Sequence, residues 1–435
     1  MSSWGTMSII EGPLVIALFV ASGALVLVLV LIRPGQRWRR RSWTLVSLVA
    51  AGVGALIGAA ATWVVDDWLN LVGVSFSPVT RVWIAGVFSG LAVAGCSLYR
   101  SRWYRRLVSV IAMGVFVLTG AIGINIDFGT YPTVNSFLGI SPYDSVPLPA
   151  LAQAQRYGAP LSAAWVAPAG MPVHGVVGSV AIPATASGFV ARKALVYLPP
   201  AALTAAPPEL PVVITLSGQP GAPSDPLLSG HLIETLDAYA AAHSGLAPIV
   251  VSPDQLGAPE NNPMCVDGAR GNSATYLTVD VVDWIRAALP VSNDAAEWGI
   301  AGFSQGGTCS IQLGAGHPEL FGAILDVSGE LVPADGDEED TIEAGFAGSR
   351  AAYLAALPEA VLKQHAPYRT FAVFAVGQND TVYRPDALVM SAAAREAGMT
   401  VTYFEAPDSA HDYATATYAF DRGFAELSAN WGLGS

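Results

Sequence analysis

The sequence has little charge. Asp, Glu, Lys and Arg make up 13% of its 435 residues and hydrophobic residues 52%, which is apolar for a soluble protein and long for a single domain. The charge is unevenly spread: residues 1–126 carry ten Arg and three acidic residues, a net +7, whereas residues 127–435 carry eleven basic and thirty-one acidic residues, a net −20. We therefore expect two parts of different character. The acidic part argues against a nucleic-acid partner, because phosphates bind to basic surfaces.

Signatures of cofactor binding are also missing from the sequence. Neither a G-x-G-x-x-G nor a Walker pattern occurs. No set of His, Cys and Asp residues has the spacing of metal ligands. We therefore expect chemistry that uses neither a bound cofactor nor a catalytic metal.

The first third of the chain contains four long apolar runs. Each is close to the ~20 residues that a helix needs to cross the hydrocarbon core of a bilayer, and no Asp, Glu, Lys or His lies in the middle of one. Gly54 and Gly58 have a small-xxx-small spacing, which we interpret as ordinary helix packing. We interpret residues 1–126 as a four-helix transmembrane anchor. The runs are residues 12–32, 43–65, 82–99 and 107–126.

The arginines predict how this anchor is oriented. Residues 33–41 carry five Arg and residues 100–106 carry four, whereas the loop from Asp66 to Thr80 has two Asp and no basic residue. The positive-inside rule places both Arg clusters in the cytoplasm, so the N-terminus and everything after about residue 127 lie outside. A cleaved signal peptide is the poorer interpretation of the first run, which lacks a basic n-region and is too long. We expect a multi-pass cell-membrane protein with an extracytoplasmic C-terminal domain.

The rest of the chain predicts a linker and then an α/β domain. Residues 127–173 are rich in Pro and Gly, and we interpret them as an extracytoplasmic linker. Over residues 174–435, short apolar runs alternate with amphipathic ones, which indicates a mostly parallel sheet covered by helices. We expect about eight strands, the first two antiparallel. The runs are Gly175–Ile182, Ala194–Leu198, Val212–Leu216, Pro248–Val251, Trp298–Gly302, Ala323–Val327, Phe371–Val376 and Val401–Phe404.

Ser304 is the strongest candidate for a catalytic residue. It lies in Gly302-Phe-Ser-Gln-Gly306, between an expected strand and an expected helix. A G-x-S-x-G in that position is typical of a nucleophile elbow, where the serine sits on a sharp turn that leaves no room for larger flanking residues. The helix N-terminus behind it favours developing negative charge.

A serine nucleophile needs a base and an acid. In this kind of fold they follow the serine in the order acid, histidine. His411 follows the last expected strand and is preferred over His317 and His365, which lie at a helix end and in a polar stretch. Asp380 follows the strand Phe371–Val376 and is the expected acid, with Asp326 as the alternative.

Two backbone N–H groups are expected to form an oxyanion hole. One belongs to Gln305, the residue after the nucleophile, and the other to Gln219, in the loop after the third strand. Gly218 lets that loop turn, and we place it with the substrate-binding residues. The alternative is that this loop merely links a strand to a helix.

The cysteines suggest one disulfide. Cys96 lies in the third apolar run and is interpreted as a packing residue. Cys265 lies in a loop after the fourth strand, and Cys309 lies one helical turn past Ser304. If the domain is extracytoplasmic, a Cys265–Cys309 disulfide can persist and would fasten that loop near the site. Two buried thiols are the alternative.

Taken together, these motifs resemble the α/β-hydrolase superfamily, and within it the "Putative esterase" group of esterase D-like enzymes and actinobacterial mycolyltransferases. The resemblance covers about residues 174–435 and implies a serine hydrolase or acyltransferase with Ser304, Asp380 and His411 as its triad. Two features differ from the group: mycolyltransferases use a glutamate as the acid, and many relatives have a Gly-Gly-His-Asp-Trp-like histidine loop. The anchor ahead of the domain looks like an actinobacterial arrangement. The motifs are LSGQPG at 216–221, GFSQGG at 302–307, GQND at 377–380 and SAHDY at 409–413.

The acidity of the C-terminal part bears on the substrate. An anionic lipid surface repels an acidic domain, whereas carboxylates can pair with a cationic head group. Residues 333–343 carry six acidic residues where hydrolases of this fold often have a cap, and Glu330 precedes them. We therefore hypothesise an envelope ester such as alanyl- or lysyl-phosphatidylglycerol, with Glu330 among the substrate-binding residues. Acidity that serves only solubility is the alternative, and an envelope acyltransferase or a non-catalytic membrane scaffold are the other functional hypotheses.

Overall fold

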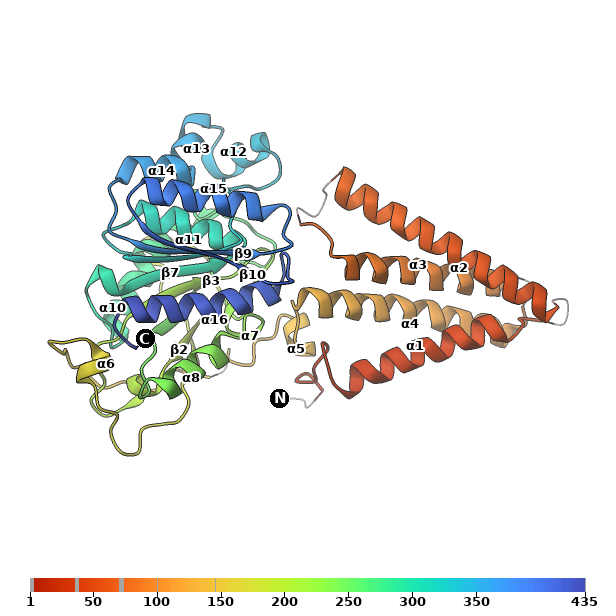
Figure 1. The fold of residues 1–435 in the computed structure, drawn as a ribbon, viewed down its shortest axis with the longest axis horizontal. Helices are drawn as coiled ribbons and strands as arrows, with labels where there is room; N and C mark the ends of the chain where they lie inside the picture. Colours follow the sequence, from red (N-terminus) through yellow and green to blue (C-terminus); the bar gives the residue numbers. More distant parts are fainter. Residues whose placement is uncertain (1–3, 36–38, 70–73, 100, 145, 435) are drawn as a thin grey trace. The chain divides into compact units, whose positions relative to one another are not determined.

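The chain forms two compact units, Met1–Leu138 and Gly139–Ser435, in the computed structural model (Figure 1). The structure describes residues 4–35, 39–69, 74–99, 101–144 and 146–434. The expected linker, residues 127–173, is divided between the units, because residues up to 138 belong with the helices of the first.

The described part of the first unit has four long helices, each of which overlaps one of the predicted apolar runs. All four are long and apolar enough to cross a membrane. The second continues beyond its α-helical part as a π-helical turn, η1 (Trp63–Trp68), and a short helix follows the fourth. The helices are α1 (Pro13–Leu31), α2 (Arg40–Thr62), α3 (Pro78–Leu98), α4 (Trp103–Phe128) and α5 (Val134–Phe137).

Close backbone approach holds α2 against α3. A Cβ atom added to Gly54 would lie 2.4 Å from the Phe88 carbonyl oxygen, and one added to Gly58 would lie 2.8 Å from Ala85 Cα. Only glycine permits this approach, so the small-xxx-small pair serves helix packing as interpreted from the sequence.

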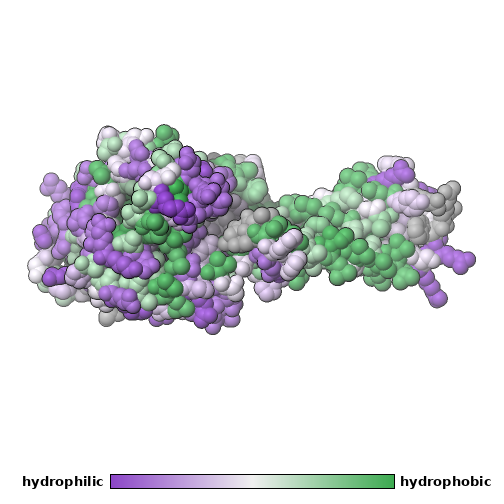
Figure 2. All heavy atoms as spheres, turned by 90° about the horizontal axis from the view of Figure 1, so that it is seen from above, coloured by the Kyte–Doolittle hydropathy of each residue, from purple (hydrophilic) through white to green (hydrophobic). Residues whose placement is uncertain are grey.

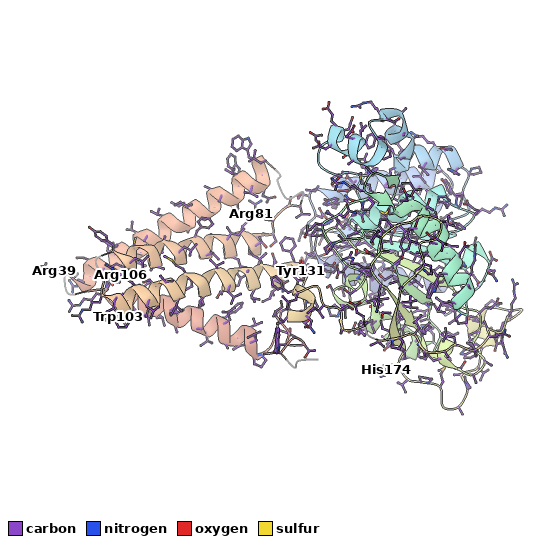
Figure 3. The ribbon with its side chains drawn as sticks, turned by 180° about the vertical axis from the view of Figure 1, so that it is seen from behind. Arg39, Arg81, Trp103, Arg106, Tyr131 and His174 are labelled. Carbon is purple, nitrogen blue, oxygen red and sulfur yellow. A yellow bond between two sulfur atoms is a disulfide. The ribbon has the colours of Figure 1, made fainter. Side chains whose placement is uncertain are left out.

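Polar groups gather at the two ends of the four-helix unit. Figure 3 shows Arg39, Trp103 and Arg106 together at one end and Arg81 and Tyr131 at the other. Figure 2 shows hydrophobic atoms along the helices and hydrophilic atoms at their end. This is the surface that a membrane-spanning bundle requires.

A buried arginine ties the arginine-rich end together. Arg105 donates to the carbonyl oxygens of Val28 (3.0 Å) and Leu29 (2.8 Å), at the C-terminal end of α1, and to Ser97 Oγ (2.8 Å). Carbonyl groups at the C-terminal end of a helix carry partial negative charge, so a cation stabilises them.

The second unit is built on an eight-stranded sheet in the order β1-β2-β4-β3-β7-β8-β9-β10. β2 runs antiparallel to both of its neighbours. The other six strands, β4, β3, β7, β8, β9 and β10 in spatial order, are parallel to one another. The prediction of eight strands with an antiparallel first pair is confirmed. They are β1 (Val176–Val180), β2 (Ala194–Leu198), β3 (Val212–Leu216), β4 (Ile249–Ser252), β7 (Trp298–Phe303), β8 (Ala323–Val327), β9 (Phe371–Gly377) and β10 (Thr400–Ala406).

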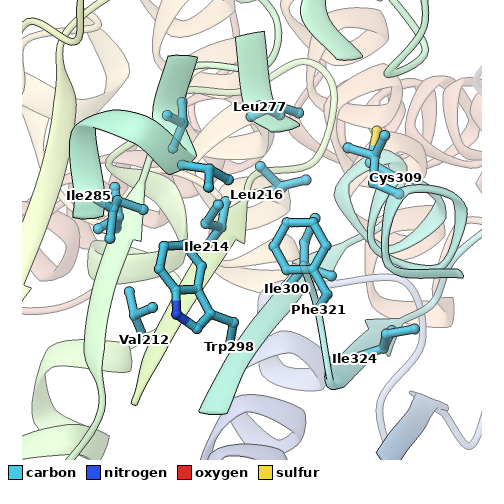
Figure 4. Close-up of a cluster of buried hydrophobic side chains, with 14 of the residues drawn as sticks. Val212, Ile214, Leu216, Leu277, Ile285, Trp298, Ile300, Cys309, Phe321 and Ile324 are labelled. Carbon is cyan, nitrogen blue, oxygen red and sulfur yellow. The ribbon is translucent and has the colours of Figure 1, made fainter. Parts of the chain in front are cut away.

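Helices cover both faces of this sheet (Figure 1). One core contains side chains of α10, α11, α14 and α15, and Figure 4 shows its centre around Trp298, Phe321 and Leu216. The core of the other face contains α8 and α16. The helices and turns of this unit are α6 (Leu161–Ala164), η2 (Pro200–Leu203), α7 (Asp225–Leu228), α8 (Leu232–Ala242), α9 (Ser273–Thr275), η3 (Tyr276–Asp280), α10 (Val281–Ala288), η4 (Ala295–Glu297), α11 (Gln305–Gly316), α12 (Glu338–Phe346), α13 (Arg350–Ala356), α14 (Pro358–His365), α15 (Tyr383–Glu396) and α16 (Tyr413–Asn430), with a short hairpin of β5 (Asp267–Gly268) and β6 (Gly271–Asn272).

Candidate active site

Ser304 occupies a strained turn between β7 and α11. Its backbone has φ 58° and ψ −121°, a conformation that is costly for a residue with a side chain. Its N–H donates to the carbonyl oxygen of Val327, at the end of the neighbouring strand β8 (2.8 Å). The turn is therefore held by the sheet, and Ser304 lies at the carboxyl edge of the parallel strands, where α/β folds bind ligands.

The flanking glycines are needed because the turn is so tight. A Cβ atom at Gly302 would lie 2.2 Å from the Gly306 carbonyl oxygen, and one at Gly306 would lie 2.5 Å from the carbonyl oxygens of Leu216 and Ser217. Real Cβ atoms do not approach backbone so closely. The G-x-S-x-G pattern thus reports the close contact of β7, α11 and the end of β3.

A hydrogen-bonded chain of three side chains ends at the serine. His411 Nε2 lies 2.8 Å from Ser304 Oγ, and His411 Nδ1 lies 3.1 Å from Asp380 Oδ2. The other carboxylate oxygen of Asp380 accepts from the N–H groups of Val382 (3.1 Å) and Tyr383 (2.9 Å). The structure thus brings together the three residues predicted from the sequence, across 107 positions of the chain.

Two aromatic rings stack on the imidazole. The ring of Phe303 stacks on His411 with centroids 4.9 Å apart, and that of Tyr383 stacks on it at 4.1 Å. His411 is buried as a result, at 9% exposure, and Asp380 at 2%. A histidine that packs against two rings and contacts a carboxylate has little freedom to leave the serine.

The alternative acids and bases are not part of this hydrogen-bonded chain. Asp326 Oδ1 accepts from the N–H of Gly329 (2.9 Å). His317 faces Glu319 on the surface, and His365 ends α14, where it is exposed. Asp412, beside His411 in the sequence, accepts from the N–H of Thr415 and caps α16.

The loop expected to complete the oxyanion hole lies against the nucleophile. A Cβ atom on Gly218 would be 3.4 Å from Ser304 Cβ, so the two segments are in contact. Gln219 follows with a cis peptide bond to Pro220, and its side chain donates to the carbonyl oxygen of Glu260 (3.2 Å). Gln305 is the first residue of α11. The segments that carry both expected donors therefore flank Ser304.

Carboxyl groups gather beside the triad. Glu330 follows β8, and burial together with the charge of Asp386 raises its pKa to about 7. Burial also raises the pKa of Asp386, with a contribution from Asp380. Burial raises the pKa of Asp326 to about 7, opposed by the N–H of Gly329. Burial raises the pKa of Tyr383, with further contributions from the charges of Glu330, Asp380 and Asp386.

The expected disulfide is present. Cys265 and Cys309 are bonded, with their Cα atoms 5.6 Å apart, and join two segments separated by 44 positions. Both residues are buried, at 1% exposure. The bond fastens the loop after β4 to the first turns of the nucleophile helix.

Several contributing residues gave no signal in the sequence. In the sequence, nothing distinguishes Phe303 and Tyr383 from other aromatic residues, because they stack on His411 only in the folded structure. Asp386 is one acidic residue on an amphipathic helix. Phe303 lies inside the G-x-S-x-G pattern, which was the one available hint. In the parts of the chain that the structure describes, no three His, Cys, Asp or Glu residues gather in a way that could hold a metal ion.

Comparison with known proteins places this site in a family context. A family model described as "Putative esterase" matches residues 190–414. An uncharacterized protein of Corynebacterium glutamicum is 30% identical over 424 residues, covering 93% of each chain, so the match extends into the four-helix unit. The S-formylglutathione hydrolase of Agrobacterium tumefaciens is 18% identical, covering 60% of this chain and 96% of its own, with a TM-score of 0.50, and shares the fold. The fluorophosphonate-binding serine hydrolase F of Staphylococcus aureus is 17% identical over 58% of this chain and 98% of its own, with a TM-score of 0.47.

Proposed function

This chain belongs to the "Putative esterase" family and is a carboxylic ester hydrolase, and we propose that it cleaves its ester through an acyl-enzyme formed on Ser304. The observation that carries the proposal is the continuous chain from Ser304 Oγ through the His411 imidazole to the Asp380 carboxylate. A serine hydroxyl is a poor nucleophile unless a base takes its proton, and this geometry supplies the base and the group that orients it.

The geometry supports the following sequence of steps. His411 Nε2 accepts the Ser304 proton as Oγ adds to the ester carbonyl, and the N–H groups of Gln305 and Gln219 stabilise the resulting oxyanion. His411 then donates its proton to the departing alcohol, which leaves the acyl group on Ser304. Water, deprotonated by the same imidazole, attacks the acyl-enzyme, the bond from the acyl carbon to Ser304 Oγ breaks, and His411 returns the proton to Oγ as the acid leaves. Asp380 keeps Nδ1 protonated and stabilises the imidazolium.

We further propose that the enzyme acts on the outer side of a membrane to which the first unit anchors it. Three observations support this. Four helices are long and apolar enough to span. The two arginine-rich segments lie at one end of those helices, the end that the positive-inside rule assigns to the cytoplasm (Figure 3). The Cys265–Cys309 disulfide is of a kind that persists in oxidising compartments.

The substrate we propose is an envelope ester with a cationic acyl group, such as an aminoacylated phosphatidylglycerol. Beyond the effect of burial, the charge of Asp386 raises the pKa of Glu330, and the charges of both carboxylates raise the pKa of Tyr383, whose ring stacks on the catalytic imidazole. An ammonium group bound there would offset the mutual repulsion of these carboxylates. A neutral acyl group would leave that repulsion in place.

A lipid assay tests the proposal. The full chain in detergent is incubated with lysyl-phosphatidylglycerol, and separately with the same lipid acetylated on both amines. We expect the enzyme to release lysine from the first lipid and to release diacetyl-lysine from the second more slowly. Ser304→Ala should release neither product. Transfer of the lysyl group to a lipid or sugar hydroxyl, rather than free lysine, would make the enzyme an acyltransferase. Loss of the preference for the amine would refute the substrate while leaving the hydrolase intact.

A further inference from the structure

The two donors of the proposed oxyanion hole belong to different parts of the chain. Gln219 lies in the loop after β3, and Gln305 begins α11 after β7. Their N–H groups must point at the same oxygen atom, and a shift of about 1 Å in such an arrangement costs about 10²-fold in rate. Some group must therefore fix the distance between these two segments.

Gln255 contacts both segments. It lies just after β4 and is fully buried. Its Nε2 donates to the carbonyl oxygen of Ser217 (2.7 Å) and lies 3.2 Å from Ser217 Oγ. The same nitrogen lies 3.2 Å from Gln305 Oε1. One amide group thus connects the residue two positions before Gln219 with the side chain of Gln305.

The rest of the loop that carries Gln255 strengthens this connection. Gln305 Nε2 lies 3.2 Å from Asn262 Oδ1. The loop after β3 contacts the same region. The N–H of Gly221 donates to the Pro259 carbonyl oxygen (3.2 Å), and the Gln219 side chain donates to the Glu260 carbonyl oxygen (3.2 Å). Residues 253–265, which we name the bridging loop, therefore contact both oxyanion segments along its length.

Each end of the bridging loop is fixed. At the C-terminal end, Cys265 is bonded to Cys309 of α11. At the N-terminal end, Asp254 is completely buried and accepts from the backbone N–H of Arg192 and from its guanidinium, at 2.6 to 2.9 Å. Arg192 Nη2 also donates to the Gly221 carbonyl oxygen (3.0 Å). The loop is thus tied both to the nucleophile helix and to the loop after β3.

We propose that Gln255 is a positioning residue, which sets the separation of the two oxyanion donors through its contacts with Ser217 and Gln305. This inference rests on the proposed function. The buried amide contacts Ser217 and the Gln305 side chain rather than a residue of the triad. Its loss should therefore weaken binding of the oxyanion and leave binding of the ground-state ester nearly unchanged.

The test compares two buried glutamines of this region. Gln255→Met removes the bridging amide at similar volume. Gln312→Met is the matched control, because the Gln312 amide also donates to the bridging loop, at the Cys265 carbonyl oxygen (3.4 Å), but two turns further along α11. For each full-length variant, kcat and KM are measured on a soluble ester, and Ki on a trifluoromethyl ketone, which adds to the serine and places an oxyanion in the hole.

We expect Gln255→Met to lower kcat by about 10- to 100-fold and to leave KM within about threefold of the wild-type value. The Ki of the ketone should rise by the same factor by which kcat/KM falls. Gln312→Met should change each value by less than about threefold. Equal effects of both variants, or a Gln255→Met enzyme with unchanged kcat and Ki, would overturn the inference. If Gln255→Met does not fold, Gln305→Leu provides the second variant, since it removes the acceptor of the bridge and keeps the backbone N–H. Absence of wild-type activity and of inhibition by the ketone would instead refute the proposed function itself.

Discussion

Asp380 and Asp412 are both acidic residues near the catalytic histidine, but they have different partners. They therefore allow a matched test. Asp380 contacts His411 Nδ1, whereas Asp412 caps α16. Asp380→Asn should lower kcat by about 10⁴-fold, because an amide no longer holds the required tautomer. Asp412→Asn should stay within about threefold, because asparagine caps a helix equally well. Ester hydrolysis by the two full-length variants checks this, and similar losses in both would contradict the assignment of the acid.

Glu330 should make the preference for a cationic substrate depend on pH. Its pKa is raised to about 7 by burial and by Asp386, so it is mostly neutral at pH 6 and mostly ionised at pH 8. The ratio of kcat/KM for the lysyl lipid to that for its acetylated form should therefore rise several-fold over this range, since the lysine side-chain amine stays charged throughout. Glu330→Gln should flatten the rise. Glu319→Gln, a surface change before β8, is the control, and an identical slope in all three proteins would count against the role of Glu330.

Asp326 should make the stability of the second unit depend on pH. Its pKa of about 7 in the folded protein exceeds the ordinary value of 3.8, so the folded state retains a proton that the unfolded state has lost. The contribution of Asp326 to the free energy of unfolding is therefore fully present below about pH 4 and is lost as the pH rises towards 7. Asp326→Asn keeps the acceptor for Gly329 and removes the charge, so it should raise Tm by about 3 °C or more at pH 8 and much less at pH 5. Thermal unfolding in detergent measures this, and an equal shift at both pH values would contradict it.

Individual residues could be predicted where the reaction or the backbone conformation at that position requires a particular residue type. Ser304 is marked by its glycines, and His411 and Asp380 follow strands whose carboxyl ends meet at one edge of the sheet. Phe303, Tyr383 and Gln255 could not be found in this way. Their roles arise from contacts between segments far apart in sequence, and an aromatic or amide side chain carries no local signal of such contacts.

At the scale of elements, the strands were predicted well because they are short, buried and apolar. Ala194–Leu198, Val212–Leu216 and Ala323–Val327 have the predicted bounds. The helices α12, α13 and α14 were not predicted. The acidic stretch 333–343 suggested a cap, and its helical part begins where Asp337 caps α12. A helix that covers only part of a surface needs few apolar residues, so its periodicity is weak.

The contact between α2 and α3 allows a test within one helix. A Cβ atom at Gly54 meets the Phe88 carbonyl oxygen at 2.4 Å, whereas one at Gly52 meets nothing within 4 Å. Gly54→Ala should therefore destabilise the four-helix unit by about 1 to 3 kcal/mol. Gly52→Ala should leave it unchanged or slightly more stable, because alanine favours the helix. Thermal unfolding of both variants in the same detergent decides, and equal stability would refute the close contact.

At the scale of the whole molecule, the distribution of charge predicts which side of the membrane each unit occupies. In a Cys96→Ala background, Ala206→Cys places a thiol at an exposed position of the second unit, and Ser101→Cys places one between α3 and α4. An impermeant maleimide should label the first variant in intact cells and the second only after permeabilisation. The reverse pattern would leave the chemistry of Ser304 unchanged and remove the argument for an envelope substrate.

The central claim is that Ser304 is a nucleophile activated by His411 and Asp380. The most direct measurement is peptide mass spectrometry of the full chain after reaction with a fluorophosphonate, which phosphonylates activated serines. We predict a single adduct on the peptide that contains Ser304, formed far more slowly in Asp380→Asn and absent in Ser304→Ala. An unmodified Ser304 in active protein, or an adduct on another serine that persists in Ser304→Ala, would contradict the account.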